Sequence, residues 1–299
     1  MSADNDHPAN AKAREHRATL PTENFFDLKT LRALPPFWGW VEHQSREASG
    51  PFRLFLGGSD DGIALRLFWN GRYEHETLAL WMRLALHHTL ALDIGAHTGI
   101  YTLAAHAANP NLNILSFEPD AQNYARLSLN LRANGRETTD AYMLGVSDAD
   151  GTSPFTVRVH SDYRSSGGTF EAVEGGQVSG LRVAALDSFL PSGIAGSVGL
   201  IKLDVEGHEH AALSGMRNLI AKSHPTLIFE CLSVATAQAA SDMLRPLGYH
   251  FHEIDDAAQT VHAIADLAPV LDAGGNPVMS RLNRVAAWRA DDLAIIRAS

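Results

Sequence analysis

The chain has 299 residues, 45% of them hydrophobic, a length that suits one large α/β domain with additions or two small domains. We expect one domain with additions. The 24 Lys and Arg stand against 34 Asp and Glu, and the formal net charge of −10 disfavours a nucleic-acid substrate, because an acidic protein repels the phosphate backbone.

The N-terminal stretch and the cysteine content predict a cytoplasmic protein. Residues 1–24 lack the apolar core of a secretory signal, and the single cysteine, Cys231, excludes an internal disulfide. The most apolar stretch, residues 78–95, is short and is interrupted by polar residues that include Arg83 and Asp93. We therefore expect no transmembrane helix.

The first part of the chain is predicted to form a tail and a cap. Residues 1–24 are polar and aperiodic, which indicates a mobile, disordered tail. Two apolar runs, residues 52–56 and 63–69, flank the sequence GGSDDG and predict a β-hairpin. A helix is expected over residues 73–86. The hairpin and helices of residues 25–88 would form a cap over the main sheet.

From Leu90 onward, short apolar strands alternate with helical stretches such as residues 121–133 and 208–221. This alternation predicts an α/β domain over residues 89–299, with a parallel sheet covered on both faces and ligands beyond the carboxyl ends of its strands. The polar, glycine-rich residues 151–183 interrupt the alternation and indicate a hairpin and a mobile loop at the rim. The predicted strands are residues 90–95, 113–119, 141–147, 198–207, 226–232 and 248–254.

The sequence LDIGAHTGIYTL begins in the first of these strands and contains a glycine turn. A dinucleotide fingerprint requires glycine where His97 and Ile100 stand, so NAD and FAD are poor candidates. The Gly-Lys-Ser/Thr of a P-loop is also absent. The turn retains an acidic residue, Asp93, and two glycines, Gly95 and Gly99, before a helix. Such a turn brings the backbone close to a ligand.

A second carboxylate follows the next strand. The spacing from Gly99 to Glu118 suits a carboxylate that accepts both hydroxyls of a ribose, while Asp93 would face an ammonium group. S-Adenosylmethionine carries both groups and no pyrophosphate. The alternative is that the glycines only form a tight turn and that Glu118 only precedes a helix, but the order and spacing of these elements favour the cofactor site.

Four segments resemble the FkbM-type methyltransferases over roughly residues 70–235: LDIGAHTGIYTL, FEPDAQNYARLSLNLRANG, ALDSFL and VGLIKLDVEGHEHAALSGM. The sequence GRYEHET is similar to the family's entry helix. One departure is His97, where the family usually carries Asn. The resemblance implies a class I, Rossmann-like methyltransferase fold: a doubly wound, mostly parallel sheet, here with an N-terminal cap.

The resemblance also implies S-adenosylmethionine as cofactor and, usually, methylation of a hydroxyl on a sugar, glycolipid or polyketide. It assigns Glu118 to the ribose and Asp148, in VSDADG, to the neighbourhood of the adenine, although Asp148 would equally suit an ordinary turn. The candidate cofactor-binding residues are Glu74, Asp93, Gly95, Ala96, His97, Gly99, Glu118, Pro119, Ser147, Asp148 and Asp204.

An alcohol acceptor must lose its proton to a base or be acidified by a metal. Asp204 ends one strand, Glu230 ends the next, and His208 follows Asp204 across a glycine, so these three are the candidate catalytic residues. They are also the candidate ligands of Mg²⁺ or Mn²⁺, which is the weaker alternative. His208 would also suit a solvated helix start. Lys202 is interpreted as a partner that neutralises buried carboxylates.

The sequence thus predicts an S-adenosylmethionine-dependent O-methyltransferase acting on a carbohydrate, glycolipid or secondary metabolite. A non-catalytic binding protein of the same fold is one alternative, opposed by the retention of the strand-end carboxylates. An N-methyltransferase is the other, opposed by the absence of an Asn/Asp-Pro-Pro-Tyr signature where DVEG stands. The acceptor would be a small molecule or glycan, held by the cap and by residues 151–183 acting as a lid. The sequence leaves the oligomeric state open.

Overall fold

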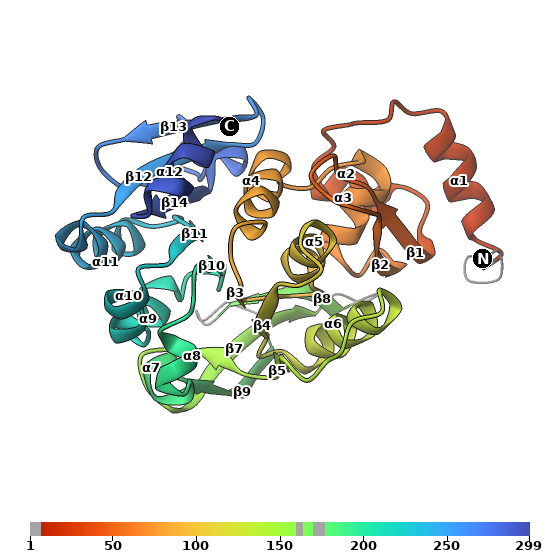
Figure 1. Ribbon diagram of the computed structural model, residues 1–299. Helices are drawn as coiled ribbons and strands as arrows, with labels where there is room; N and C mark the ends of the chain where they lie inside the picture. Colours follow the sequence, from red (N-terminus) through yellow and green to blue (C-terminus); the bar gives the residue numbers. More distant parts are fainter. Residues whose placement is uncertain (1–6, 160–163, 170–176) are drawn as a thin grey trace.

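The computed structural model describes residues 7–159, 164–169 and 177–299 (Figure 1). The N-terminal elements and the C-terminal strands lie at opposite ends of the molecule, with the remaining strands between them. The N-terminal elements are α1 (Asn10–Ala18), α2 (Leu28–Ala33), β1 (Phe37–His43), β2 (Phe52–Gly58) and α3 (Gly62–Asn70).

The N-terminal hairpin joins different segments from those predicted. Strand β2 pairs antiparallel with the preceding β1, from Phe37 opposite Gly58 to His43 opposite Phe52. Residues 63–69, predicted as the second strand, lie in helix α3, so that prediction was wrong. Asp61 caps this helix by accepting the backbone N–H groups of Ile63 and Ala64, and a capping carboxylate favours a helix over a hairpin turn.

The predicted disordered tail is also wrong for its described part, because residues 10–18 form α1. The Asn10 side chain donates to the carbonyl of Trp38 at 2.6 Å and accepts its N–H at 2.8 Å. The Arg17 guanidinium donates to the carbonyls of Phe68, Pro21 and Thr22 at 2.7 to 2.8 Å. Polar side chains therefore attach this segment to the rest of the molecule, a role that composition alone does not reveal.

The main sheet has eight strands in the order β13-β12-β14-β11-β10-β3-β4-β5. The strands β5, β4, β3, β10 and β11 are parallel neighbours, and β14 runs antiparallel between β11 and β12. The predicted doubly wound, mostly parallel α/β sheet is thereby confirmed. The strands are β3 (Leu90–Ile94), β4 (Asn113–Phe117), β5 (Ala141–Tyr142), β10 (Leu200–Leu203), β11 (Thr226–Glu230), β12 (His250–Asp255), β13 (Thr260–Ile264) and β14 (Asn283–Ala287).

Helices cover both faces of this sheet. Strands β3, β10 and β11 are buried along their whole length, because one apolar cluster packs on each face and alternate residues of a strand point to opposite faces. The first face is covered by α4 (His75–Ala85), α5 (Ile100–Ala108), α6 (Ala121–Ala133) and α12 (Ala290–Arg297), and the second by α9 (Glu209–Ser214), α10 (Arg217–Ser223) and α11 (Val234–Leu244).

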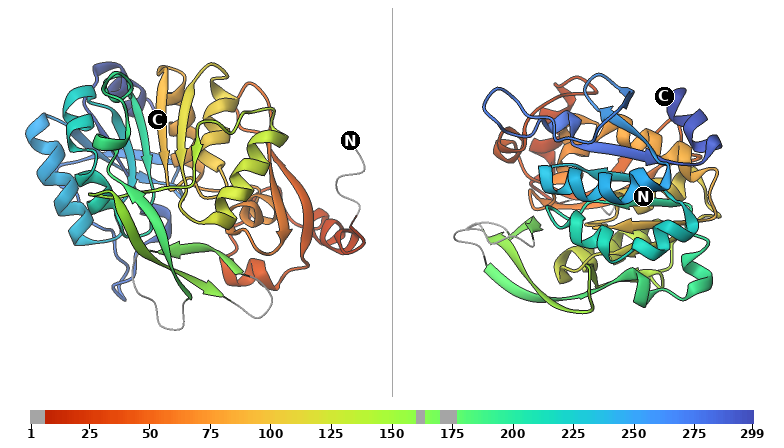
Figure 2. Two further views of the ribbon diagram at one scale, coloured as in Figure 1. Left: turned by 90° about the horizontal axis from the view of Figure 1, so that it is seen from below. Right: turned by 90° about the vertical axis from the view of Figure 1, so that its left-hand side faces the viewer.

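A second, four-stranded sheet in the order β6-β9-β7-β8 occupies the region predicted as a rim insertion. Its strands β7 and β9 pair antiparallel and extend as an arm from the main body (Figure 2). Residues 160–163 and 170–176, which form part of the predicted lid, lie outside the described residues. The elements are β6 (Gly145–Val146), β7 (Gly151–Val159), β8 (Arg164–Thr169) and β9 (Gln177–Ala184), followed by the short helices α7 (Leu186–Phe189) and α8 (Ser192–Ala195).

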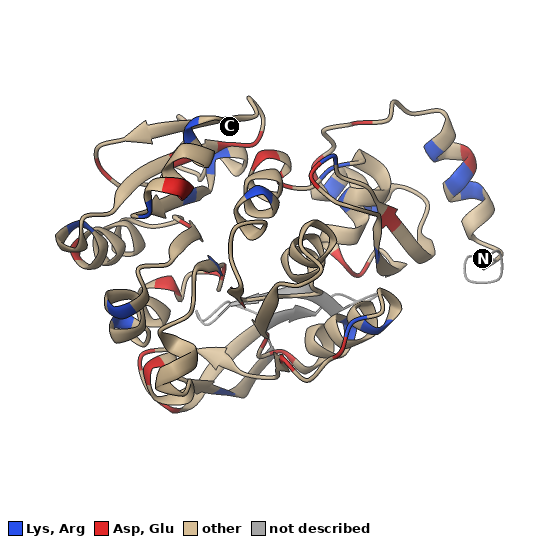
Figure 3. Cartoon of the chain, viewed as in Figure 1, with Lys and Arg blue, Asp and Glu red and all other residues tan. Residues whose placement is uncertain are grey.

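The charged residues are spread over the fold, with Lys and Arg on α1, α6 and α10 among other elements (Figure 3). Within the described part of the chain, no helix combines the length and the apolarity that a membrane crossing requires.

Candidate active site

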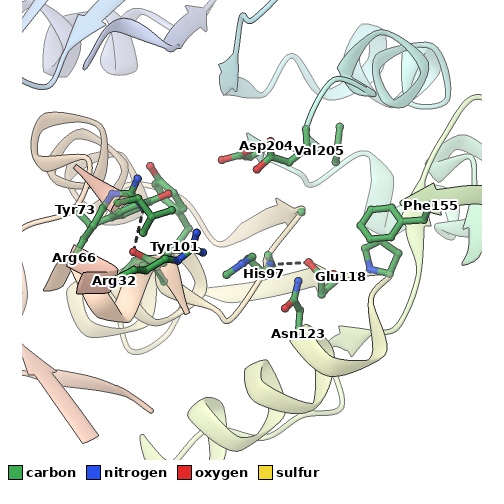
Figure 4. Close-up of a pocket in the computed structure, with 18 residues that line it drawn as sticks. Arg32, Arg66, Tyr73, His97, Tyr101, Glu118, Asn123, Phe155, Asp204 and Val205 are labelled. Carbon is green, nitrogen blue, oxygen red and sulfur yellow. Dashed lines mark hydrogen bonds between the residues drawn. The ribbon is translucent and has the colours of Figure 1, made fainter. Parts of the chain in front are cut away.

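A cavity lined by six of the predicted site residues lies where the strand order of the main sheet reverses. Strand β3 is followed in the chain by β4 on one side, while β10 pairs with its other side, and in doubly wound sheets ligands bind at this switch point. The cavity has a volume of about 260 Å³. It is lined by Leu28, Arg32, Gly62, Ile63, Arg66, Tyr73, Gly95, Ala96, His97, Ile100, Tyr101, Glu118, Pro119, Asn123, Phe155, Asp204, Val205 and Glu206 (Figure 4).

The loop after β3 lies flat against the ends of both neighbouring strands. The N–H groups of Gly95 and Ala96 donate to the carbonyl of Phe117 on β4, at 2.9 and 3.0 Å. A Cβ at position 95 would lie 1.7 Å from the backbone carbonyl oxygen of Asp204, and φ of Gly95 is +83°. Only glycine fits here without moving backbone. Gly95 is therefore required by its close approach to the backbone of Asp204, and the approach of this turn to a ligand stays a prediction.

Glu118 lies in the cavity wall beside this loop. Its Oε2 accepts the N–H of His97 at 2.9 Å, and its Oε1 accepts the N–H of Asp120 at 2.8 Å. Burial raises the pKa of Glu118 to about 8, although both backbone hydrogen bonds oppose this shift. A carboxylate has about four lone-pair sites, so beyond the two backbone N–H groups and the Asn123 side chain about one site remains for a hydroxyl. These residues therefore fit the ribose of an adenosyl cofactor.

Two residues of the predicted cofactor loop support it from behind. The Asp93 side chain is 1% exposed and accepts a hydrogen bond from the Thr102 hydroxyl at 2.6 Å, away from the cavity lining. Asp93 thus contacts α5, and its predicted contact with an ammonium group stays a prediction. Gly99, at φ +98°, begins α5 where a Cβ would lie 2.7 Å from Leu127. It serves the packing of α5 on α6.

Backbone strain gathers around the cavity. Among the described residues, five that are not glycine have positive φ, and three of these are Glu74 (36°), His97 (51°) and Glu206 (52°). Such conformations cost energy and concentrate at functional sites. Asn and His adopt the left-handed region more readily than most residues, which explains how His97 can stand where the family usually carries Asn.

Asp204 presents its carboxylate to the cavity from the end of β10. The ammonium of Lys202, which is fully buried, lies 3.0 Å from Asp204 Oδ2, 3.3 Å from Asn283 Oδ1 and 4.7 Å from the centre of the Tyr101 ring. Although burial disfavours its charged form, the surrounding carboxylates, led by Asp204, raise the pKa of Lys202. The predicted role of Lys202 as a partner for buried carboxylates agrees with these contacts.

Two further carboxylates lie close to that of Asp204. One oxygen of each of Glu74, Asp204 and Glu230 lies within 4.8 Å of the others. Glu74 accepts a hydrogen bond from the hydroxyl of Tyr101, and Glu230 Oε2 is buried with no hydrogen-bond partner. Burial, followed by the charge of neighbouring carboxylates, raises the pKa of Glu230, and burial also raises that of Glu74. These three carboxylates are therefore the candidate oxygen ligands for Mg²⁺ or Mn²⁺.

His208 does not join Asp204 and Glu230, so the predicted metal set of these three residues is wrong. His208 Nε2 lies 2.9 Å from the hydroxyl of Ser147, which itself donates to Asp148 Oδ1 at 3.1 Å. Because the serine donates its proton to the carboxylate, the imidazole donates to the serine. His208 therefore belongs with Ser147 and Asp148 at the end of β6, away from the cavity lining.

The sequence DVEGHE forms the turn that presents Asp204 and Glu206. The carboxylate of Glu209 accepts the N–H groups of Val205 and Gly207 at 3.1 and 3.2 Å, which stabilises the turn before α9. Burial, with Asp204 as the next cause, raises the pKa of Glu206 to about 7. Glu206 was not among the predicted site residues, although its position two residues after Asp204 could have indicated it.

Several other lining residues were missed from the sequence. Tyr73 directly precedes the predicted Glu74, and Asn123 lies on the helix that follows Glu118, so both were within reach of motif reasoning. Arg32 and Arg66 come from α2 and α3, far from the motifs in sequence. No local pattern places these two arginines at the sheet.

This fold, with a glycine loop and a buried carboxylate at the switch point of the sheet, is that of the class I S-adenosylmethionine-dependent methyltransferases. The chain belongs to the FkbM family of these enzymes, because residues 93–259 match the Methyltransferase FkbM domain.

Similar proteins include the hexuronic acid methyltransferase AglP of Haloferax volcanii, which is 27% identical over 150 residues, 50% of this chain and 59% of that protein. The chain thus matches less than two thirds of this relative. Among solved structures, an FkbM methyltransferase from Methylobacillus flagellatus is 14% identical with a TM-score of 0.43, covering 93% of this chain and 60% of that one. An S-adenosylmethionine-dependent methyltransferase from Agrobacterium tumefaciens is 11% identical with a TM-score of 0.42, covering 84% and 70%.

Proposed function

We propose that this enzyme transfers a methyl group to a hydroxyl of a carbohydrate, glycolipid or secondary metabolite, with Asp204 as the general base. The observation that carries this proposal is the Asp204 carboxylate, which enters the cavity beside the Gly95 loop and is oriented by the Lys202 ammonium at 3.0 Å. The similarity to a hexuronic acid methyltransferase supports a carbohydrate among these acceptor classes.

Bound S-adenosylmethionine supplies an electrophilic methyl group on a sulfonium. The chain must orient the acceptor, exclude water and take the proton of a weakly nucleophilic hydroxyl. Asp204 suits the last task because its carboxylate is a hydrogen-bond acceptor at the cavity wall, and Lys202 fixes its direction. Apolar residues such as Ile63 and Ile100 make the cavity drier, which strengthens every charge interaction inside it.

Asp204 is a better candidate base than the alternative His208, because Asp204 lines the cavity whereas His208 lies outside its lining, beside Ser147 at 2.9 Å. Ser147 and Asp148 retain their proposed place near the adenine, and His208 would orient them. The proposed compartment is the cytoplasm, which suits the one free, buried cysteine, Cys231, among the described residues.

A divalent metal held by Glu74, Asp204 and Glu230 is the second candidate for activating the acceptor. The buried, unpartnered Glu230 Oε2 favours it, since an isolated oxygen of this kind is costly without a partner. The Lys202 ammonium opposes it, because it already supplies a positive charge to Asp204 within hydrogen-bond distance. We therefore prefer the metal-independent route.

The test uses S-adenosylmethionine whose transferable methyl group is isotopically labelled. The purified protein is incubated with labelled S-adenosylmethionine and an extract of its host, and products are fragmented by mass spectrometry. We expect the label on an oxygen of a hydroxyl-bearing product. Label on nitrogen would support an N-methyltransferase, and cofactor binding without any labelled product would support the non-catalytic alternative.

A further inference from the structure

The charges of the cavity wall are divided between its two sides. Glu118, Asp204 and Glu206 line it at the ends of the strands, whereas Arg32 and Arg66 line it from the N-terminal helices α2 and α3. Figure 4 shows Arg32 and Arg66 beside Tyr73 on one side of the cavity, and Glu118 and Asn123 on the other. In a protein with a net charge of −10, two guanidinium groups facing one cavity need an explanation.

Arg66 has few partners within the protein. Its guanidinium donates to the carbonyl of Gly62 at 3.1 Å, one turn back in its own helix, and no carboxylate of the described chain forms an ion pair with it. Its neighbours in the lining include the apolar side chains of Leu28 and Ile63. A partly buried charge in such surroundings is costly without an opposite charge. A guanidinium also presents five donors in a fork that matches carboxylates and phosphates.

The arginines lie on the side of the cavity opposite Glu118. If the ribose is bound by Glu118, the adenosyl part occupies that side, and the methionyl part points toward Asp204 and the arginines. Two anions could therefore reach Arg66: the methionyl carboxylate of the cofactor, or an anionic group of the acceptor. Both arginines lie outside residues 93–259, which match the family domain. A contact outside the shared domain suits the acceptor better than the shared cofactor.

We propose that Arg66, with Arg32 on the same wall, binds a carboxylate or phosphate of the methyl acceptor. This inference rests on the proposed function and narrows it: the acceptor is an anionic molecule that carries a hydroxyl, of the type of a uronate or a sugar phosphate. The guanidinium groups hold the anion, and the hydroxyl to be methylated is thereby directed toward Asp204 across the cavity.

The experiment measures binding of three probes by NMR titration to protein saturated with S-adenosylhomocysteine. Glucuronate and glucose 1-phosphate should each be compared with neutral glucose. We expect one anion to bind at least about tenfold more tightly than glucose, and its identity separates carboxylate from phosphate. Arg66→Met should abolish this preference, while Arg66→Lys, which keeps the charge but loses the fork, should retain part of it.

Arg46→Gln is the matched control, because the Arg46 side chain is 77% exposed on the surface and lies outside the cavity lining. It removes the same charge and should leave the preference unchanged. Equal binding of glucose and both anions by the wild type, or an anion preference that survives in Arg66→Met, would overturn the proposal. Unfolding curves verify that each variant is folded. If Arg66→Met does not fold, a reduced anion preference in Arg66→Lys tests the proposal instead.

A second pair of titrations separates the two sources of the anion. S-Adenosylhomocysteine carries the methionyl carboxylate, and 5′-methylthioadenosine lacks it. If Arg66→Met weakens only the former by tenfold or more, Arg66 binds the cofactor and the acceptor assignment is wrong. The anion subsite and the proposed function can fail independently. If the wild type methylates a neutral hydroxyl compound as well as an anionic one, the proposed function stands and the anion subsite is wrong.

Discussion

The two walls of the cavity use different parts of the polypeptide. The first wall is formed by the backbone after β3, where Gly95 donates to the carbonyl of Phe117 and packs closely against the backbone of Asp204. From α2 and α3 the chain offers long side chains, among them Arg66, which donates to the Gly62 carbonyl of its own helix and pairs with no carboxylate of the described residues. The first wall, which we call the cofactor wall, suits the predicted cofactor, and the second suits the proposed acceptor. The comparison teaches that rigidity and specificity are supplied by different segments.

The strongest way to break the cofactor wall is Gly95→Ala. A Cβ there would meet the Asp204 carbonyl at 1.7 Å, and neither backbone can yield without disturbing a buried strand. We expect a loss of about 3 kcal/mol or more in unfolding free energy and loss of measurable S-adenosylhomocysteine binding.

Gly135→Ala is the control for this substitution. Gly135 has a similar φ of +69° but no atom within 4 Å of the added Cβ, so the backbone strain alone should cost about 1 kcal/mol. Denaturant unfolding and calorimetry measure both variants. Similar losses in the two would mean that the close approach to Asp204 does not constrain the loop.

At a pH above 8, where Glu118 is ionised, Glu118→Gln should weaken S-adenosylhomocysteine binding by about 1–3 kcal/mol, because the ribose loses a charged acceptor. The exposed Glu42 on β1 offers the matched control, Glu42→Gln, which should leave the affinity unchanged. Calorimetry measures both. Unaltered affinity in Glu118→Gln would place the ribose elsewhere.

The same variant should alter the dependence of stability on pH. Burial raises the pKa of Glu118 to about 8 in the folded protein from an ordinary value of 4.5. The folded state therefore holds a proton that the unfolded state releases, and this contribution to stability is present below pH 4.5 and is lost as the pH rises through 8. Between pH 5 and 8.5, Glu118→Gln should lose less stability than the wild type. Parallel Tm profiles of the two proteins would contradict this.

The smallest effect is expected from chelation. EDTA should leave the rate unchanged, because the Lys202 ammonium already lies 3.0 Å from Asp204. If instead EDTA abolishes the rate and Mg²⁺ or Mn²⁺ restores it, Glu230→Gln should be as damaging as Asp204→Asn, since both residues would be ligands.

The sequence predicted the cofactor wall well because its signals are local. A glycine turn after a buried strand, and a carboxylate after the next strand, are close in the chain, and the topology of a parallel sheet brings their ends together. The positions of Gly95, Glu118 and Asp204 in one cavity follow from this. Asp93 was correctly placed on its strand, but its orientation depends on the hydroxyl of Thr102, which no spacing rule indicates.

The remaining errors concern long-range packing. Residues 63–69 are apolar enough for either a strand or a helix, and the capping by Asp61 decided the outcome. The choice between His208 and Glu74 as neighbour of Asp204 depended on how two distant segments pack. For the same reason, the sequence could not place Arg66 in the cavity, and the role of residues 151–183 as a lid stays a prediction.

The most direct test of the account is the kinetics of Asp204→Asn. This substitution keeps the size of the side chain and removes the base, so we expect kcat to fall by about 10²-fold or more. The affinity for S-adenosylhomocysteine should stay within about threefold of the wild type, because the cofactor wall is intact. A variant that keeps full kcat would contradict the central role of Asp204 and leave catalysis to positioning alone.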